Sequence, residues 1–479
     1  MLASLSLSAA VAGDVLPVSG SWLNLFYQDE RNKYSNPMNM DNTDPAMWRA
    51  KVREMKALGI EFIVFMATAN EGKADYPSKI MPLAYDDVSR ESPVSAIMDE
   101  AAREGMKVFM SIGWAENQDD NLRNPAILNR QLAIMQELAA IYGNSPAFYG
   151  WYLPVEDCLG PVLSDAAVVA VNKLVERAHK LTPGKKTLIS PYGFFCCRFN
   201  DPQFARQIKR LKVDIIAYQD EVGCVREEFP MPRLKNAWRE MKKIHDETKI
   251  EFWANCELFS WEKGTNSRQS ALVPAAMPRV ISQLAAASEA GVSRIISFMT
   301  PGIWSLNADC FPLGQPEVSH RAALDYLAWR NGDRTLSLLE KSLTGSLSSS
   351  YRDGSPLTDG ITGDENPENP AWQRYEAGYH EISLNLPRAS TGSVFLRFLN
   401  CAKRGFGVPY KVYIYTADDD NSADSFHLQR IYDMAQHPNS LHDTWIEPLL
   451  IEWTSPTSRV KIALQSTDPL LIDEFFLLP

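Results

Sequence analysis

The chain has 479 residues, of which 45% are hydrophobic and 10% aromatic, enough apolar side chains for a large globular core. Its formal net charge of −11 argues against nucleic acid or an anionic membrane surface as a partner. No apolar run approaches the ~20 residues of a membrane-spanning helix, and CxxC, HxH and HExxH metal motifs are missing from the sequence. At this length we expect two domains.

Residues 1–13 form a short apolar and serine-rich run that ends in Ala10-Val11-Ala12. This ending resembles a signal-peptidase site, although the basic start of a signal peptide is missing. The alternative is a disordered N-terminus. We favour the remnant of an export signal, so we expect an exported protein that is periplasmic, attached to the cell surface or secreted.

Strand-like runs and amphipathic helices alternate through residues 14–332. Most of the strand-like runs lack polar alternation, which is typical of parallel strands that are covered on both faces. We predict eight strands in this region: Ser21–Gln28, Phe62–Thr68, Lys107–Trp114, Phe148–Glu156, Thr187–Phe194, Val213–Gln219, Glu251–Glu257 and Arg294–Thr300.

The helices between these strands carry clear start and stop signals. Asp44-Pro45, Ser92-Pro93 and Asp201-Pro202 each place a capping side chain before a proline, which is favoured at the first helical position. Gly59 lies where the first helix should end. Eight strand–helix units in succession predict an α/β fold of the (β/α)8 TIM-barrel type rather than an open sheet.

After residue 332 the pattern changes to short β-type runs separated by turn residues, including the turn cluster Asp418-Asp419-Asp420-Asn421. This texture predicts an all-β sandwich, or jelly roll, over residues 333–479. The predicted strands are Glu381–Leu386, Ser393–Asn400, Tyr410–Thr416, Leu449–Thr454, Val460–Gln465 and Leu471–Leu477.

In a barrel of this type, function gathers at the carboxyl ends of the strands. Aromatic, carboxylate and amide side chains gather there, and they suit a sugar, whose C–H faces stack on rings while its hydroxyls bind polar groups. We expect an oligo- or polysaccharide partner, with Trp114, Trp261 and Trp304 as solvent-facing platforms. The candidate substrate-binding residues are Trp22, Asn24, Tyr27, Trp114, Tyr192, Tyr218, Asp220, Asn255, Trp261 and Trp304.

Two glutamates at the ends of predicted strands are the candidate catalytic residues. Glu156 closes the fourth predicted strand and Glu257 closes the seventh. Cleavage of a glycosidic bond needs one carboxyl group that gives a proton and a second that stays ionised. Asp220 and Glu221, after the sixth strand, are alternatives to Glu257. A solvated or ion-paired loop carboxylate is the structural alternative for each glutamate.

The placement of these glutamates resembles the large glycosidase clan whose barrels carry an acid/base Glu after strand four and a nucleophile after strand seven. The resemblance implies a retaining glycoside hydrolase with Glu156 as acid/base, Glu257 as nucleophile and no cofactor for catalysis. The clan usually has Asn before the acid/base, where this chain has Val155. That departure favours the alternative, a non-catalytic glycan-binding protein that uses the barrel cleft and the β-sandwich. A metal-dependent barrel hydrolase ranks third.

The N-terminal part also resembles, over roughly residues 18–330, a bacterial family of glycosidase-like barrels that is named only as a domain of unknown function. The residues that carry this resemblance are Ser21-Trp22-Leu23-Asn24, the run Gly150-Trp151-Tyr152 that leads to Glu156, and Tyr218-Gln219-Asp220. It implies the barrel fold more strongly than any activity, because a shared barrel does not fix a reaction.

The C-terminal part resembles a discoidin-type, galactose-binding-like jelly roll. The resemblance is carried by Ser342-Leu343-Thr344, Leu357-Thr358-Asp359-Gly360, Trp372 and the closing Ile472-Asp473-Glu474. It implies an accessory domain that binds glycans or braces the barrel. It also implies a structural calcium ion held by Asp359 and Glu474, whose oxygens are hard ligands. A turn aspartate and a solvated glutamate are the alternative.

Most of the seven cysteines fall at or near the functional end of the predicted barrel: Cys158, Cys196, Cys197, Cys224, Cys256 and Cys310. One or two disulfides that brace the loops are expected if the protein is exported. Buried free thiols are the alternative, and a metal–thiolate site is disfavoured because regular spacing and nearby histidines are missing. Seven is an odd number, so at least one thiol lacks an intramolecular partner.

Overall fold

The structure is a computed structural model that describes residues 15–25, 44–85, 91–114, 116, 124–223, 231–261, 272–275, 277–306, 316–332, 355–417, 426–434 and 444–478. The chain divides into two compact units. The first comprises Met1–Phe259 with Gln283–His320, and the second comprises Ser260–Ser282 with Arg321–Pro479. The division of the chain at residue 333, and the export signal within residues 1–13, stay predictions.

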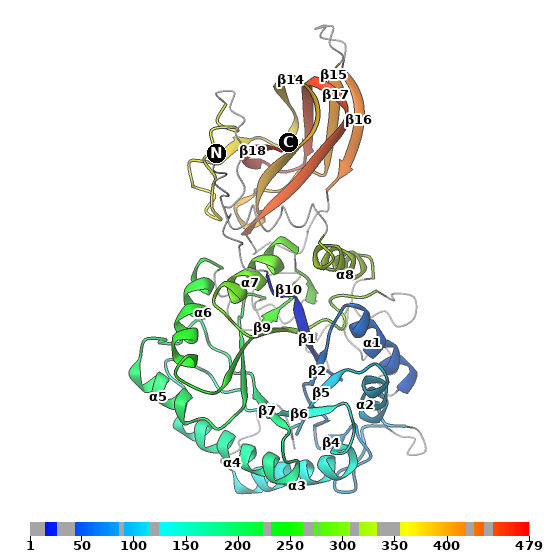
Figure 1. The fold of residues 1–479 in the computed structure, drawn as a ribbon, viewed down its shortest axis with the longest axis vertical. Coiled ribbons are helices and arrows are strands. Elements are labelled where there is room, and N and C mark those ends of the chain that lie inside the picture. Colours follow the sequence, from blue (N-terminus) through cyan, green and yellow to red (C-terminus); the bar gives the residue numbers. More distant parts are fainter. Residues whose placement is uncertain are drawn as a thin grey trace, which may run out of the picture. The chain divides into compact units, whose positions relative to one another are not determined.

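The first unit holds a closed barrel of parallel strands in the order β1-β12-β9-β8-β7-β6-β5-β2 (Figure 1). Neighbours in the barrel follow one another along the chain, and the last strand, β12, closes onto β1. This topology confirms the predicted (β/α)8 barrel. The strands are β1 (Val18–Leu23), β2 (Phe62–Phe65), β5 (Lys107–Ser111), β6 (Phe148–Tyr152), β7 (Lys186–Ile189), β8 (Ile215–Gln219), β9 (Glu251–Glu257) and β12 (Arg294–Phe298).

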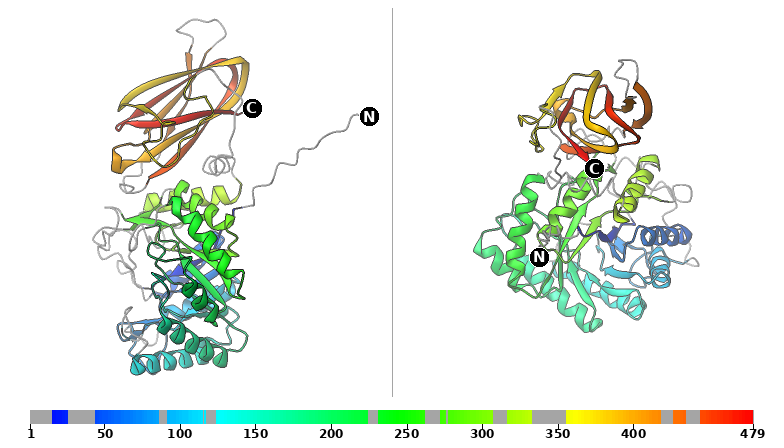
Figure 2. Two further views of the ribbon diagram at one scale, coloured as in Figure 1. Left: turned by 90° about the vertical axis from the view of Figure 1, so that its left-hand side faces the viewer. Right: turned by 45° about the horizontal axis from the view of Figure 1, so that its top comes forward.

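Helices surround the barrel strands on the outside, as the further views also show (Figure 2). They are α1 (Pro45–Ala57), α2 (Pro93–Arg103), α3 (Pro125–Tyr142), α4 (Asp165–Leu181), α5 (Pro202–Arg210), α6 (Met231–His245) and α7 (Met277–Glu289). The last helix of the chain, α8 (Pro316–Arg330), belongs mostly to the second unit. The predicted caps are confirmed, because Asp44, Ser92 and Asp201 each accept a hydrogen bond from the first turn of their helix. Among the described residues no helix is both long and apolar enough to cross a membrane.

Several predicted barrel strands run past the observed carboxyl ends, whereas β9 has the predicted bounds. The reason is that apolar residues continue beyond the strands into the loops. Trp114, Leu153 and Phe194 follow strands β5, β6 and β7, and all three are buried. Short strands lie in the loops after β2 and β9: β3 (Ala69–Asn70), β4 (Lys73–Ala74), β10 (Phe259–Trp261) and β11 (Leu272–Pro274).

The second unit holds a six-stranded antiparallel sheet in the order β13-β18-β14-β17-β15-β16. Its long central strands, β14 and β17, pair along their lengths with breaks in register between Asn385 and Gly392. The elements are β13 (Gln373–Tyr375), β14 (Gly378–Cys401), the 3-10 helix η2 (Ala402–Arg404), β15 (Lys411–Ala417), β16 (Phe426–Asp433), β17 (Thr444–Ser466) and β18 (Leu470–Leu478).

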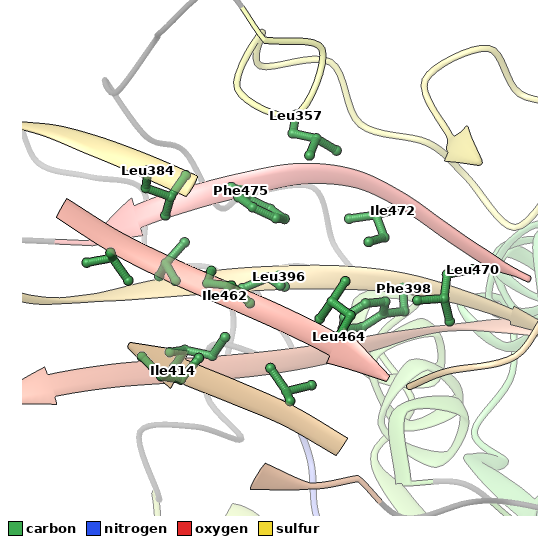
Figure 3. Close-up of a cluster of buried hydrophobic side chains, with 14 of the residues drawn as sticks. Leu357, Leu384, Leu396, Phe398, Ile414, Ile462, Leu464, Leu470, Ile472 and Phe475 are labelled. Carbon is green, nitrogen blue, oxygen red and sulfur yellow. The ribbon is translucent and has the colours of Figure 1, made fainter. Parts of the chain in front are cut away.

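One hydrophobic cluster joins the two halves of these long strands (Figure 3). Leu384 of β14 and Ile462 of β17 lie on one side of the break in register. Leu396 and Ile451 lie on the other side. Their side chains pack together, so the halves form two facing layers, as in a β-sandwich. The predicted strands Glu381–Leu386 and Ser393–Asn400 are therefore the two halves of one bent strand. The predicted turn Asp418-Asp419-Asp420-Asn421 lies outside the described residues.

Candidate active site

Glu156 lies just beyond the carboxyl end of β6, on the loop that leads to α4. Tyr152, the last residue of β6, is fully buried, and its hydroxyl donates a hydrogen bond of 2.9 Å to Glu156 Oε1. Glu156 itself is half-buried. A rigid strand therefore orients this carboxyl group through a fixed donor, while part of the side chain still reaches solvent.

Trp22, from β1, contacts Tyr152 across the mouth of the barrel. Their rings meet edge to face with centroids 4.5 Å apart, although strands β2 and β5 lie between β1 and β6 in the barrel order. Trp22 also lies 6.5 Å, between ring centroids, from Phe298 at the end of β12. The indole ring thus links three strand ends at the same edge of the barrel.

Glu257 is the last residue of β9, and only 1% of it is exposed. Its backbone N–H donates to Asp220 Oδ1 at 3.1 Å, and its carbonyl accepts from Gln283 Nε2 at 3.1 Å. Gln283 Nε2 also donates to Asp220 Oδ2 at 2.6 Å, so one amide group binds both the Asp220 carboxylate and the Glu257 backbone. A Cβ atom at Gly223 would lie 2.6 Å from Glu257 Cβ and 2.6 Å from the carbonyl oxygen of Phe259, so the loop after β8 has room only for glycine there.

The two glutamates share a set of aromatic neighbours. Glu156 is bonded to Tyr152, Tyr152 packs on Trp22, and Trp22 packs on Phe298. Phe298 is the register partner of Glu257 in the β12–β9 pair. Both carboxyl groups therefore belong to the same end of the barrel. The expected separation of about 5–5.5 Å between them stays a prediction.

Asp220 and Glu221, the alternatives to Glu257, hold backbone in place. Both are fully buried. Asp220 Oδ1 accepts a hydrogen bond from the backbone N–H of Glu257. Glu221 Oε2 accepts from the N–H groups of Gly193 at 2.9 Å and Phe194 at 2.7 Å. Carboxylates that bind backbone donors in this way fix loops. Asp220, predicted to bind substrate, therefore lies beside Glu257 as a positioning residue.

Two predicted asparagines are buried at the barrel strands. Asn24, just past β1, is 6% exposed, and Asn255, in β9, is 1% exposed. Asn255 Nδ2 donates to Ser190 Oγ at 3.1 Å. Asn255 Oδ1 and Trp22 Nε1 are buried and hydrogen-bond to none of the described residues. Water or a polar ligand could supply the hydrogen bonds that these buried atoms need.

The structure does not expose Tyr218, which the sequence predicts to bind substrate. This residue is fully buried, and its hydroxyl lies 2.9 Å from Nε2 of His245 in α6. Burial lowers the pKa of His245 to about 4, so the ring is neutral at pH 7. Tyr218 therefore packs toward the helices instead of the barrel mouth. The sequence does not separate the two faces of β8, because the strand is buried throughout.

The expected exposure of the tryptophan platforms is also wrong where it can be checked. Trp304 is 0% exposed and Trp114 is 6% exposed, so neither ring faces solvent. Tyr192 is half-buried, and its carbonyl accepts a hydrogen bond of 2.7 Å from Leu159 N, which joins the loops after β6 and β7. Tyr27 and the side chain of Trp261 lie outside the described part of the chain.

Because Trp304 is buried, Trp304→Ala is expected to destabilise the protein. Loss of a buried tryptophan side chain typically costs about 3–5 kcal/mol in the free energy of unfolding. Tyr379→Ala is the control, since Tyr379 is 52% exposed, and it should cost less than about 1 kcal/mol. Denaturant unfolding of the two variants measures the difference. Equal stability of both variants would mean that the Trp304 ring contributes little to the core.

Asp75 is a buried carboxyl group that the sequence does not reveal. It follows β4, is 3% exposed, and its Oδ2 hydrogen-bonds to none of the described residues. Burial raises the pKa of Asp75 from 3.8 to about 7. Since the folded-state pKa lies above the unfolded value, the contribution of Asp75 to stability is fully present below pH 3.8 and is lost as the pH rises to 7.

Asp75→Asn is therefore expected to gain stability relative to the wild type as the pH rises. The asparagine carries no proton to lose, so the gain between pH 4 and pH 8 should be on the order of 3 kcal/mol. Urea unfolding of both proteins at these two pH values measures it. The same difference in unfolding free energy at both pH values would show that Asp75 titrates normally.

The predicted calcium ligands both lie near the loop before β13. Glu474 is fully buried and accepts from Gly360 N at 3.0 Å, and Asp359 Oδ1 accepts from Ile361 N at 2.7 Å. Next to them, Asp473 pairs with Arg397 at 3.1 Å. Within the described ranges no cluster of three or more His, Cys, Asp or Glu side chains could hold a metal ion. Calcium binding stays a prediction that needs backbone carbonyl ligands as well.

The barrel region matches a known protein family. The family described as "Domain of unknown function (DUF4434)" matches residues 18–307, which is more than half of the chain. The chain belongs to the DUF4434 family. This DUF4434 match covers the barrel strands, and the discoidin-type resemblance of the C-terminal unit stays a prediction. No curated protein matches the chain.

Two solved structures are similar to this DUF4434 protein. A candidate α-L-fucosidase from Bacteroides thetaiotaomicron VPI-5482 has 17% identity and a TM-score of 0.51, over 65% of this chain and 94% of its own. GH5_18 from Streptomyces cattleya, in complex with GlcNAc, has 12% identity and a TM-score of 0.43, over 67% and 82%. At 17% identity the likeness to the first structure shows the fold alone.

Proposed function

We propose that this DUF4434 protein hydrolyses glycosidic bonds by a retaining, two-carboxylate mechanism. The observation that carries the proposal is the placement of Glu156 and Glu257 at one end of the barrel, joined through Tyr152, Trp22 and Phe298. A glycosidase needs two carboxyl groups with different tasks on opposite sides of the scissile bond. The aromatic set between them is buried, so it holds the ends of β1, β6 and β12 in fixed positions around the two carboxyl groups.

Glu156 suits the task of acid/base. It is half-buried, so the carboxyl group is partly shielded from water yet open to a substrate. In the first step its proton passes to the leaving glycosidic oxygen, and in the second step it takes a proton from water. The Tyr152 hydroxyl holds Oε1 in place through both steps. We expect a raised pKa for Glu156 in the presence of an ionised Glu257.

Glu257 suits the task of nucleophile. Its backbone N–H donates to Asp220 and its carbonyl accepts from Gln283, and these two hydrogen bonds fix the backbone that carries the carboxylate. Attack of the carboxylate on the anomeric carbon forms a glycosyl–enzyme ester as the leaving group departs. Water then attacks the same carbon, the ester bond breaks, and the product keeps the original anomeric configuration.

The second candidate function is glycan binding without catalysis. Val155 stands where glycosidases of the resembled clan usually have Asn, and this substitution favours a barrel that only holds sugar. The buried Asn255 Oδ1 and Trp22 Nε1 would serve binding as well as hydrolysis. The C-terminal β unit is proposed as a discoidin-like accessory domain that contributes to glycan binding, and the protein is proposed to be exported.

A glycan panel decides between the two functions. The full chain is screened for binding and for released reducing ends, together with Glu257→Gln and the control Glu176→Gln, whose side chain is exposed on α4. Hydrolysis predicts release by the wild type and the control, and none by Glu257→Gln. Binding without release by any of the three proteins would establish the non-catalytic function instead.

The proposed calcium ion has its own test. A ligand that binds only the folded state stabilises it, so removal of calcium with EDTA is expected to lower the melting temperature of the full chain by several degrees. Asp359→Ala should melt at the lower temperature with or without EDTA, because its ligand is missing. An unchanged melting temperature of the wild type in EDTA would show that no calcium ion stabilises the folded protein.

A further inference from the structure

The loops after β6 and β7 bring two cysteines together beside Glu156. Cys158 lies on the first loop, two positions after Glu156, and Cys196 lies on the second. Their Sγ atoms are 3.6 Å apart, and both residues are half-buried. Both thiols are free in the structure. A disulfide bond is about 2.05 Å long, so the sulfurs must approach by only about 1.5 Å.

Backbone hydrogen bonds already hold the two loops against each other. Leu159 N donates to Tyr192 O at 2.7 Å, and Arg198 N donates to Pro161 O at 2.9 Å. On the second loop these bonds flank Cys196, and on the first loop both lie within three residues after Cys158. Glu221 also holds the second loop, because its carboxylate accepts hydrogen bonds from Gly193 N and Phe194 N. The cysteines are therefore juxtaposed by a network that does not depend on a bond between them.

The surroundings are also shaped to fit the sulfur atoms. A Cβ atom at Gly160 would lie 2.1 Å from Cys196 Sγ, and one at Gly193 would lie 2.8 Å from Cys158 Sγ. Any larger residue at these two positions would push the sulfurs out of place. Of the other described cysteines, Cys197 is half-buried, whereas Cys256 and Cys401 are buried and are unsuited to attack by an oxidant from solvent.

We propose that Cys158 and Cys196 form a disulfide under oxidising conditions and that this bond braces the loop that carries Glu156. The oxidant is a small-molecule disulfide such as oxidised glutathione. One protein thiolate attacks it and releases one reduced thiol, and the second thiolate attacks the resulting mixed disulfide and releases another. Two electrons pass to the oxidant, and the two protein thiol protons end on the released thiols.

The bond should form slowly at neutral pH and faster at alkaline pH. Burial, with the neighbouring Cys158, raises the pKa of Cys196 to about 12, and burial also raises the pKa of Cys197. Thiolates are the reacting species, so a high thiol pKa limits the rate of exchange. Once formed, a bond across a loop of 38 residues constrains the unfolded chain and stabilises the folded one.

The test is oxidation of the full chain with excess oxidised glutathione at pH 8.5, followed by alkylation and peptide mapping without reductant. A peptide pair linked through Cys158 and Cys196 is expected, together with a rise in melting temperature of roughly 5 °C that dithiothreitol reverses. Cys158→Ser and Cys196→Ser should lose both effects. Cys197→Ser and Cys401→Ser are the matched controls and should keep them.

Three results would overturn the proposal. Cys158 could be recovered as an alkylated thiol or as a stable glutathione adduct, it could be linked to Cys197 instead, or the correct link could form without a rise in melting temperature. Mapping of the wild type does not depend on the folding of any variant. All readouts are made without substrate, so the outcome is independent of whether the barrel hydrolyses glycans.

Discussion

Glu257→Ala is expected to abolish turnover of whichever glycan the protein cleaves, lowering the rate by more than about 10⁴-fold. The reason is that no other carboxylate can take over the attack on the anomeric carbon. Asp220 and Glu221, which directly follow β8, accept hydrogen bonds from backbone N–H groups. The rate is measured with the substrate identified in the glycan panel.

Glu251→Gln is the matched control for this variant. Glu251 is the first residue of β9, at the opposite end of the strand from Glu257, and it pairs with Lys186 at 3.2 Å. Loss of an exposed ion pair should change stability by less than about 1 kcal/mol and leave turnover intact. If Glu257→Ala keeps more than a tenth of the wild-type rate, Glu257 is not the nucleophile.

Glu156→Ala is expected to slow hydrolysis by about 10²–10⁴-fold for glycosides with poor leaving groups. Activated aryl glycosides should suffer less in the step that breaks the glycosidic bond, because their leaving groups need little help from a proton. The ratio of the two rate losses is the measurement. An equal loss with both kinds of substrate would assign Glu156 to binding instead of proton transfer.

Tyr152→Phe provides the companion variant. The Tyr152 hydroxyl donates to Glu156 Oε1, and a hydrogen bond to a carboxylate favours its ionised form. Removal of that donor should raise the pKa of Glu156, so the alkaline limb of the pH–rate profile, where the general acid loses its proton, moves to higher pH. An unchanged profile, with only a uniform loss of rate, would limit Tyr152 to packing against Trp22.

The barrel could be predicted from the sequence because local signals agree with the tertiary fold. The prolines at 45, 93 and 202 start helices after capping residues, and these caps form as expected. The position of Glu156 and Glu257 after strands was also accessible, since both end apolar runs. The sandwich followed from its short β runs, although the bend that joins Glu381–Leu386 to Ser393–Asn400 in one strand was not predicted.

The orientation of individual side chains could not be predicted in the same way. Tyr218 and Trp304 belong to segments that are buried on every side, so hydrophobic alternation does not tell the mouth of the barrel from its outer face. Gln283 lies in the middle of α7, and nothing in its neighbourhood along the chain marks it as a partner of Glu257. Such contacts depend on residues far apart in sequence.

The separation of the Glu156 and Glu257 carboxyl groups is the most direct test of the retaining mechanism. A crystal structure of the full chain measures it without knowledge of the sugar. A retaining mechanism predicts about 5–5.5 Å between the two carboxyl groups, which leaves room for a covalent intermediate but not for a bridging water. A separation beyond roughly 10 Å would contradict the pairing of the two glutamates and with it the proposed mechanism.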